Sequence, residues 1–184
     1  AIYASAGDAA ITISNSDFIS NNSTGAAAGA VYLGGSTFTG NNLKFISNTA
    51  NSDGGAIYAA SGAVAVNLIN CTLDGNSAGG TGGAIFSVSD VNISKSRFLN
   101  NTATGRGGAL NLSTHSSSTN VTSKIDNSLF YNNVSNDATN GGGIMYLTRA
   151  NSPQTNNLTA TNNTFYSNHS PNGTWGALAF FTNN

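Results

Sequence analysis

Seven aspartates supply every side-chain carboxylate of this 184-residue chain, which contains no glutamate. Paired carboxylates are the machinery of polysaccharide hydrolases and lyases, where they act as general acid and base or bind Ca²⁺. A retaining glycosidase holds its two carboxyl groups about 5 Å apart, and an inverting one about 6.5 to 9.5 Å apart. The candidates for such a pair are Asp8, Asp17, Asp53, Asp74, Asp90, Asp126 and Asp137.

Histidine, serine and cysteine offer little further chemistry. His115 lies in a Ser/Thr-rich stretch and His169 follows an asparagine, and neither has an acidic neighbour in sequence. A Ser-His-Asp triad assembled from distant segments stays open, but nothing distinguishes one serine among many. Cys71 is the single cysteine, so no internal disulfide forms, and zinc-type Cys/His spacings are missing. We expect no cofactor and no metal site.

The elements that must position these residues are set by a repeat. Its first mark is a Gly-rich tetrapeptide that ends in an aliphatic residue, at 28–31, 54–57, 82–85, 107–110, 141–144 and 175–178. Successive starts are 26, 28, 25, 34 and 34 residues apart. The unit therefore has a core length near the shortest spacing, and the longer units carry insertions.

The second mark is a large apolar residue followed three positions later by asparagine. The pairs are Phe18/Asn21, Phe45/Asn48, Leu73/Asn76, Phe98/Asn101, Phe130/Asn133 and Phe165/Asn168. Short runs with alternating apolar residues, such as residues 65–69 and 90–94, precede these pairs. Alternation with period two indicates strands.

The repeat length selects the architecture. Helical solenoids need longer stretches with a period of 3.6, and a propeller blade needs about 40 to 50 residues. A unit of 25 residues suits one coil of a parallel β-helix with three short strands and three turns. The sequence therefore predicts an all-β fold, a right-handed parallel β-helix (solenoid) of about six coils, formed by residues 1–184 as one segment.

In such a solenoid, equivalent residues stack in columns about 4.8 Å apart. The Phe and Leu marks are expected to form an interior stack, in which each buried side chain contributes about 1.5 to 3 kcal/mol. The paired asparagines are expected to occupy turns with positive φ and to bond their amides along the column. The Gly-Gly pairs are expected to form tight corners, and Cys71 to be a small buried filler.

The same geometry weighs against catalysis. Asp17 and Asp74 flank the same edge two coils apart, at roughly 10 Å, which is too far for a glycosidase pair. The aspartates are better explained as solvated turn residues, and we expect no enzyme.

Composition excludes further classes. Charged residues make up 7% of the chain and the net charge is −1, so no basic stripe predicts a nucleic-acid partner. No apolar run reaches the roughly 18 residues of a membrane-spanning helix, so we expect no direct membrane insertion by this segment.

The last two complete units carry the insertions, at residues 112–124 and 147–157. Adjacent insertions on one face of a solenoid commonly build its binding surface. His115, Lys124 and Arg149 are therefore candidate binding-loop residues. The alternative is that these are tolerated loops without a partner.

The paired marks, six times in register, resemble the repeats of the polymorphic outer membrane proteins of chlamydiae and their relatives. The resemblance implies an autotransporter-like β-helical passenger segment at the extracellular or outer cell surface, with adhesion to a protein or glycan receptor. Departures at Ala28, Leu73, Gly143 and Trp175 weaken individual repeats.

The ends of the chain suggest how the segment is used. Residues 1–14 align with residues 56–69, so the chain starts within a unit, and it stops early in another. We expect a segment excised from a longer repeat array. The alternative function is a subunit of an extracellular filament that self-associates end to end, and a polysaccharide lyase or hydrolase is the remaining one.

Overall fold

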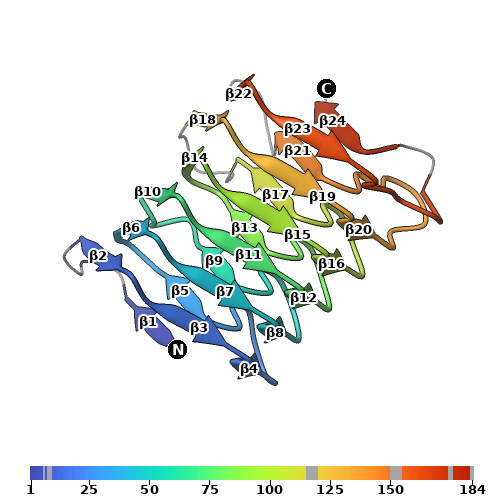
Figure 1. Cartoon of the computed structure of the whole chain (residues 1–184). Helices are drawn as coiled ribbons and strands as arrows, with labels where there is room; N and C mark the ends of the chain where they lie inside the picture. The colour runs from blue at the N-terminus through green and yellow to red at the C-terminus, as the bar shows by residue number, and fades with distance from the viewer. Residues whose placement is uncertain (6, 8–9, 115–119, 150–154, 174–175, 183–184) are drawn as a thin grey trace.

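Short strands separated by Gly- and Asn-rich corners stack along one axis in the computed structural model (Figure 1). The structure describes residues 1–5, 7, 10–114, 120–149, 155–173 and 176–182. Among these residues, twenty pairs of strands have a defined register. All twenty pairs are parallel, from β1/β5 to β21/β24. Among the described residues, no helix is long and apolar enough to cross a membrane.

Two sheets carry the longest strands. Sheet A consists of β1 (Ile2–Ala4), β5 (Val31–Leu33), β9 (Ile57–Ala59), β13 (Ile85–Ser87), β17 (Leu110–Ser113), β21 (Met145–Arg149) and β24 (Leu178–Thr182). Sheet B consists of β2 (Ile11–Ser14), β6 (Thr37–Asn41), β10 (Ala65–Ile69), β14 (Asp90–Ser94), β18 (Val121–Asp126) and β22 (Asn156–Thr161).

The strands of the other two sheets are shorter on average. Sheet C consists of β3 (Asp17–Ile19), β7 (Lys44–Ile46), β11 (Thr72–Asp74), β15 (Arg97–Leu99), β19 (Leu129–Tyr131) and β23 (Thr164–Tyr166). Sheet D consists of β4 (Asn22–Ser23), β8 (Thr49–Ala50), β12 (Ser77–Ala78), β16 (Thr102–Ala103) and β20 (Val134–Ser135).

The parallel solenoid is confirmed, but the expected three strands per coil are wrong. Each coil from β1 to β20 has four strands, because the two residues after the ladder asparagine also form strand pairs, as Ser77 does with Thr49 and Thr102. Sheets B and C each hold six strands in the described residues, which agrees with about six coils.

The predicted interior stack is confirmed. Phe18, Phe45, Leu73, Phe98, Phe130 and Phe165 occupy one register column of sheet C. The rings of Phe98 and Phe130 stack with centroids 4.8 Å apart, and both side chains are fully buried. At the last coil Phe165 remains 40% exposed, because no described ring covers its outer face. The column therefore buries its middle members most completely.

The asparagine column was predicted correctly as an amide ladder but wrongly as a set of left-handed turns. The prediction of positive φ is wrong for all six members, which are Asn21, Asn48, Asn76, Asn101, Asn133 and Asn168. Each amide nitrogen from Asn21 to Asn133 donates to Oδ1 of the next member, at 2.7 to 2.9 Å. Asn21 and Asn168 at the two ends are partly exposed, and the four members between them are fully buried.

The ladder satisfies each inner amide completely. Asn101, for example, donates through Nδ2 to Asn133 Oδ1 (2.9 Å) and to the Leu73 carbonyl (2.9 Å). Its Oδ1 accepts from the backbone N–H and the amide of Asn76. Burial of such an amide therefore carries no desolvation penalty from an unpaired group.

Positive φ occurs instead at two neighbouring corners. One precedes sheet C, at Asn15, Asn42, Asn70, Lys95, Asn127 and Asn162. The other follows it, at Ser20, Ser47, Gly75, Asn100, Asn132 and Ser167. The sequence pattern assigned the left-handed turn to the asparagine one residue after the observed corner. A left-handed corner and a hydrogen-bonded amide ladder both favour asparagine, so residue type alone does not separate them.

The Gly-Gly corners form as predicted. Gly82 adopts a φ of +68°, and a Cβ on Gly83 would lie 2.0 Å from the Gly108 carbonyl oxygen. The next two positions, Ala84 and Ile85, are fully buried. Close approach of successive coils therefore requires the second glycine, and the corner conformation requires the first.

One repeat is misaligned by the sequence pattern. Leu110 pairs with Met145, and Ala109 N–H donates to the Ile144 carbonyl at 3.0 Å. The equivalent tetrapeptide is therefore 142–145 rather than 141–144, and Gly143 is not a departure from alanine. The run of three glycines allowed either register in the sequence.

The insertions partly extend strands. β18 and β22 each span six residues, compared with five in β14. Lys124 lies within β18, so its assignment to a loop is wrong: the inserted residues continue the sheet B ladder.

Cys71 is buried as predicted, with its backbone N–H donating to Ser96 Oγ, and burial raises the pKa of its thiol.

Candidate binding face

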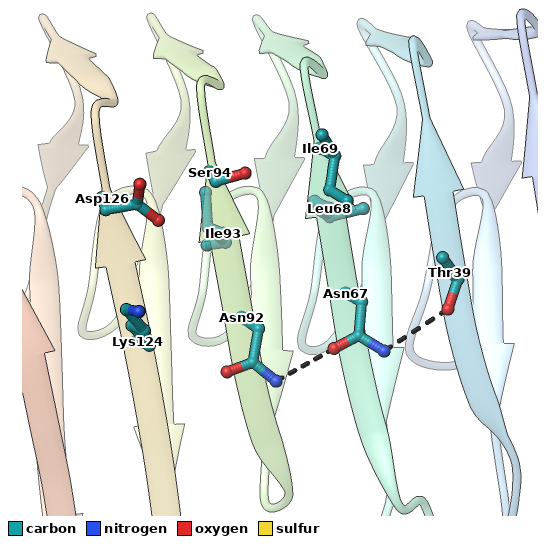
Figure 2. Close-up of a pocket in the computed structure, with 9 residues that line it drawn as sticks. All are labelled: Thr39, Asn67, Leu68, Ile69, Asn92, Ile93, Ser94, Lys124 and Asp126. Atoms are coloured by element: carbon teal, nitrogen blue, oxygen red, sulfur yellow. Dashed lines mark hydrogen bonds between the residues drawn. The ribbon is translucent and has the colours of Figure 1, made fainter.

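Sheet B presents polar side chains in register on its outer face (Figure 2). Strand alternation turns Val66 and Leu68 into the core and leaves Asn67 between them facing outward. Its column along the helix axis contains Thr12, Thr39, Asn67, Asn92, Lys124 and Thr159. The outer face therefore carries a row of hydroxyl and amide groups that is continued by the ammonium group of Lys124.

Hydrogen bonds hold the middle of this row in place. Asn92 Nδ2 donates to Asn67 Oδ1 at 2.9 Å, and Asn67 Nδ2 donates to Thr39 Oγ1 at 3.4 Å (Figure 2). These bonds orient both amides before any ligand arrives. Preorganised side chains lose less conformational entropy on binding than free ones.

A shallow open hollow of about 450 Å³ lies over this row. Its lining includes Asn67, Asn92 and Lys124, with Ser94 and Asp126 in the next outward column. Ile69, 44% exposed, adds an apolar side chain between the polar ones. The hollow thus combines amide, hydroxyl, charged and aliphatic groups, which can bind a ligand rich in hydroxyls.

Comparison with known proteins places the fold. A family model described as a right handed beta helix region matches residues 1–183. The chain belongs to the right-handed β-helix family. No curated protein and no solved structure matches it.

In this β-helix the candidate binding residues do not form one site. Lys124 lies on the outer face of sheet B. Arg149 is the last residue of β21 in sheet A, where its backbone pairs with Thr182, so its assignment to a loop is also wrong. His115 lies outside the described residues. The sequence pattern identified Lys124, which lines the hollow, but missed the amide row beside it. The signal for this row is the polar residue between two inward-facing apolar residues, Asn67 in β10 and Asn92 in β14.

The two carboxylates considered as a catalytic pair have structural partners. Asp17 forms an ion pair with Lys44 at 3.5 Å, and Asp74 accepts from Asn100 Nδ2 at 2.8 Å. Both lie in sheet C strands rather than in turns, because each is the strand neighbour of a core-facing apolar mark, Phe18 or Leu73. Within the described residues, no group of three or more His, Cys or Asp side chains could hold a metal ion.

Sheet A carries an aromatic column that sequence reasoning missed. The rings of Tyr3, Tyr32, Tyr58 and Phe86 stack in register, with centroids 4.9, 5.4 and 4.9 Å apart. Its signal is the aromatic residue that follows the tetrapeptide in these coils. Each inner ring has both faces covered by neighbours, so the column exposes mainly ring edges and is better suited to stabilising the coils than to stacking on a sugar.

Arg106, in the corner that precedes β17, contacts a strand of sheet A and the segment that follows β20. Its guanidinium lies 4.8 Å from the Tyr146 ring centroid, and its Nε lies 3.6 Å from Asp137 Oδ2. Burial opposes ionisation of Asp137, but hydrogen bonds from the Asn140 and Thr139 N–H groups, with the charge of Arg106, lower its pKa below the ordinary value. These contacts tie successive coils together.

Proposed function

We propose that this right-handed β-helix is a non-catalytic, adhesin-like scaffold at the extracellular or outer cell surface. The outer face of sheet B meets a glycan or protein receptor. The observation that carries the proposal is the preoriented row of Thr39, Asn67 and Asn92 within an open hollow. The resemblance of the repeats to polymorphic outer membrane protein passengers, which are autotransporter-like, supports the same role.

A stiff scaffold suits this role. Every inner coil bonds to the coils before and after it, so the outward columns keep a fixed spacing along the axis. A receptor with repeated hydroxyl or amide groups can therefore contact several coils without reordering them. Hydrolase or lyase chemistry is less well supported, because Asp17 and Asp74 lie on sheet C, away from the sheet B hollow, and already contact Lys44 and Asn100.

The test is binding of the purified chain to a surface printed with neutral and acidic glycans and with collagen, fibronectin and laminin. We expect retention on at least one surface, and an affinity loss of about two- to tenfold for Asn92→Ala, since one hydrogen bond contributes about 0.5 to 1.5 kcal/mol. Asn22→Ala, at an exposed strand position of sheet D, is the matched control and should bind normally. Failure to bind any surface, or equal losses in both variants, contradicts the proposal.

A second function, a subunit of an extracellular filament, is supported by one feature. The first and last coils leave core-facing apolar side chains incompletely buried: Ile11 and Phe18 are partly buried, and Phe165 is 40% exposed. A second copy stacked end to end would cover them.

A further inference from the structure

The lysine and arginine side chains that the structure describes divide into those with an ion pair and those without one. Lys44 pairs with Asp17 and Arg106 pairs with Asp137. Within the described part of the chain, Lys95, Arg97 and Lys124 form no ion pair. All three lie in two adjacent coils, and Lys95 and Arg97 are exposed on either side of the buried Ser96.

Lys95 occupies a position that is unfavourable for lysine. The five other coils have asparagine at this corner, and Lys95 adopts their left-handed conformation with a φ of 51°. That conformation costs a non-glycine residue about 1 to 2 kcal/mol, and asparagine tolerates it best. Lysine also lacks the amide that bonds Asn70 to Asn42 at 2.7 Å. A residue that costs local stability indicates a functional use of its charge.

A hollow adjoins these two cations. It measures about 280 Å³, and its lining includes Lys95, Arg97, Asn127, Asn162 and Thr164. Its side chains offer two cationic groups, with amide and hydroxyl donors beside them. Such donors match the oxygens of a carboxylate or sulfate, and arginine can bind either through two parallel hydrogen bonds.

The hollow continues the sheet B face around a corner. Ser94 and Asp126 line the sheet B hollow, and the residues that follow them, Lys95 and Asn127, line this one. A ligand chain that lies along β14 and β18 can therefore contact both. Asp126 is the nearby carboxylate, and its Oδ2 accepts from Asn127 Nδ2 at 2.8 Å.

We propose that the hollow at Lys95 and Arg97 binds the carboxylate or sulfate of an acidic glycan, with Asn162 as an amide donor. The inference rests on the proposed function, because it names the ligand class of the scaffold. The charged groups fix the acidic substituent, and the amide row of sheet B contacts hydroxyls of the same chain.

Calorimetric titration tests this inference, with three probes at low salt: a sulfated heparin-derived octasaccharide, a polygalacturonate oligomer as the carboxylate source, and a neutral glucan oligomer. At least one acidic probe should bind, and the neutral one should not. Arg97→Gln and Lys95→Asn should each weaken binding about tenfold, the loss expected for a hydrogen bond to a charged group. Lys95→Asn should also raise the melting temperature, because it restores the amide column.

Two controls separate a site from general charge attraction. Lys44→Gln removes a paired cation of another coil and should change the affinity less than twofold, while Asp126→Asn should strengthen binding several-fold because it removes a nearby negative charge. No acidic probe binding, equal binding by a single-stranded DNA of similar charge, or equal losses in Lys44→Gln and Arg97→Gln overturns the inference. If Lys95→Asn and Arg97→Gln retain full binding to a printed surface that Asn92→Ala loses, the inference fails and the proposed function stands.

Discussion

Phe98 lies in the middle of the ring column, where its side chain is fully buried and its ring stacks on Phe130. Replacing it with alanine removes that burial and leaves a cavity between coils that cannot collapse, because both neighbours are fixed by ladder bonds. We expect Phe98→Ala to lower the free energy of unfolding by about 3 to 5 kcal/mol. Urea denaturation followed by circular dichroism measures this change.

Phe165 is the matched position, since it continues the same column but is 40% exposed. Phe165→Ala should cost clearly less than Phe98→Ala, because part of its surface already contacts water. Equal costs at the two positions would contradict the view that depth within the column sets the contribution of each ring.

For individual residues, the sequence predicted which side chains stack in a column better than it predicted their backbone conformations. Residue identity repeated at a fixed interval is sufficient to place Phe98 over Leu73, because register follows from the repeat alone. It cannot decide which asparagine turns and which is buried. Asn100 has a φ of 54° and Asn101 forms the ladder, yet they are adjacent identical residues. Only hydrogen-bond geometry distinguishes them.

The Gly-Gly corner is the element that sets the distance between successive coils. A Cβ on Gly83 would meet the Gly108 carbonyl oxygen at 2.0 Å and the Thr102 backbone at 2.7 Å, and neither can move without breaking the ladder. We expect Gly83→Ala to cost about 1 to 3 kcal/mol, the range for overpacking. Thermal denaturation provides the measurement.

Gly25→Ala is the control, because a Cβ there meets no atom within 4 Å. It should change the free energy of unfolding by less than about 0.5 kcal/mol. A Gly83→Ala protein as stable as Gly25→Ala would show that the coils can separate at this corner. If Gly83→Ala fails to fold while Gly25→Ala folds normally, the close-contact argument holds.

Some strands could be predicted from the sequence and others could not, for a related reason. The five-residue run of β10 alternates clearly, so sheet B was evident from sequence. The two-residue strands of sheet D are too short to show any alternation, and they were missed. The sequence places Lys124 in a loop because it belongs to the insertion at residues 112–124, whereas the backbone pairing with Thr159 extends the strand through it. Prediction of the amide row beside Lys124 requires knowledge of which face of each strand points outward.

At the scale of the whole stack of coils, the outermost coils of this 184-residue chain are surfaces through which copies of it can meet. Phe165 has one ring face against Phe130, at a centroid distance of 5.3 Å, and remains partly exposed to water. At the other end of the described stack, the core-facing side chains of Ile11 and Phe18 are only partly buried. Coil-on-coil contact would bury such side chains and pair the strand edges beside them, so we expect concentration-dependent association along the axis.

Sedimentation velocity over a hundredfold concentration range, with electron microscopy of the largest species, tests this expectation. Phe165→Lys places a charge in the end contact and should keep the chain monomeric, because an unpaired charge is costly to bury. Tyr131→Lys, on the lateral outer face of sheet C and 39% exposed, should associate like the original chain. A monomer at every concentration would rule out the filament function, and association lost equally in both variants would indicate lateral contact through sheet C instead of stacking of coils.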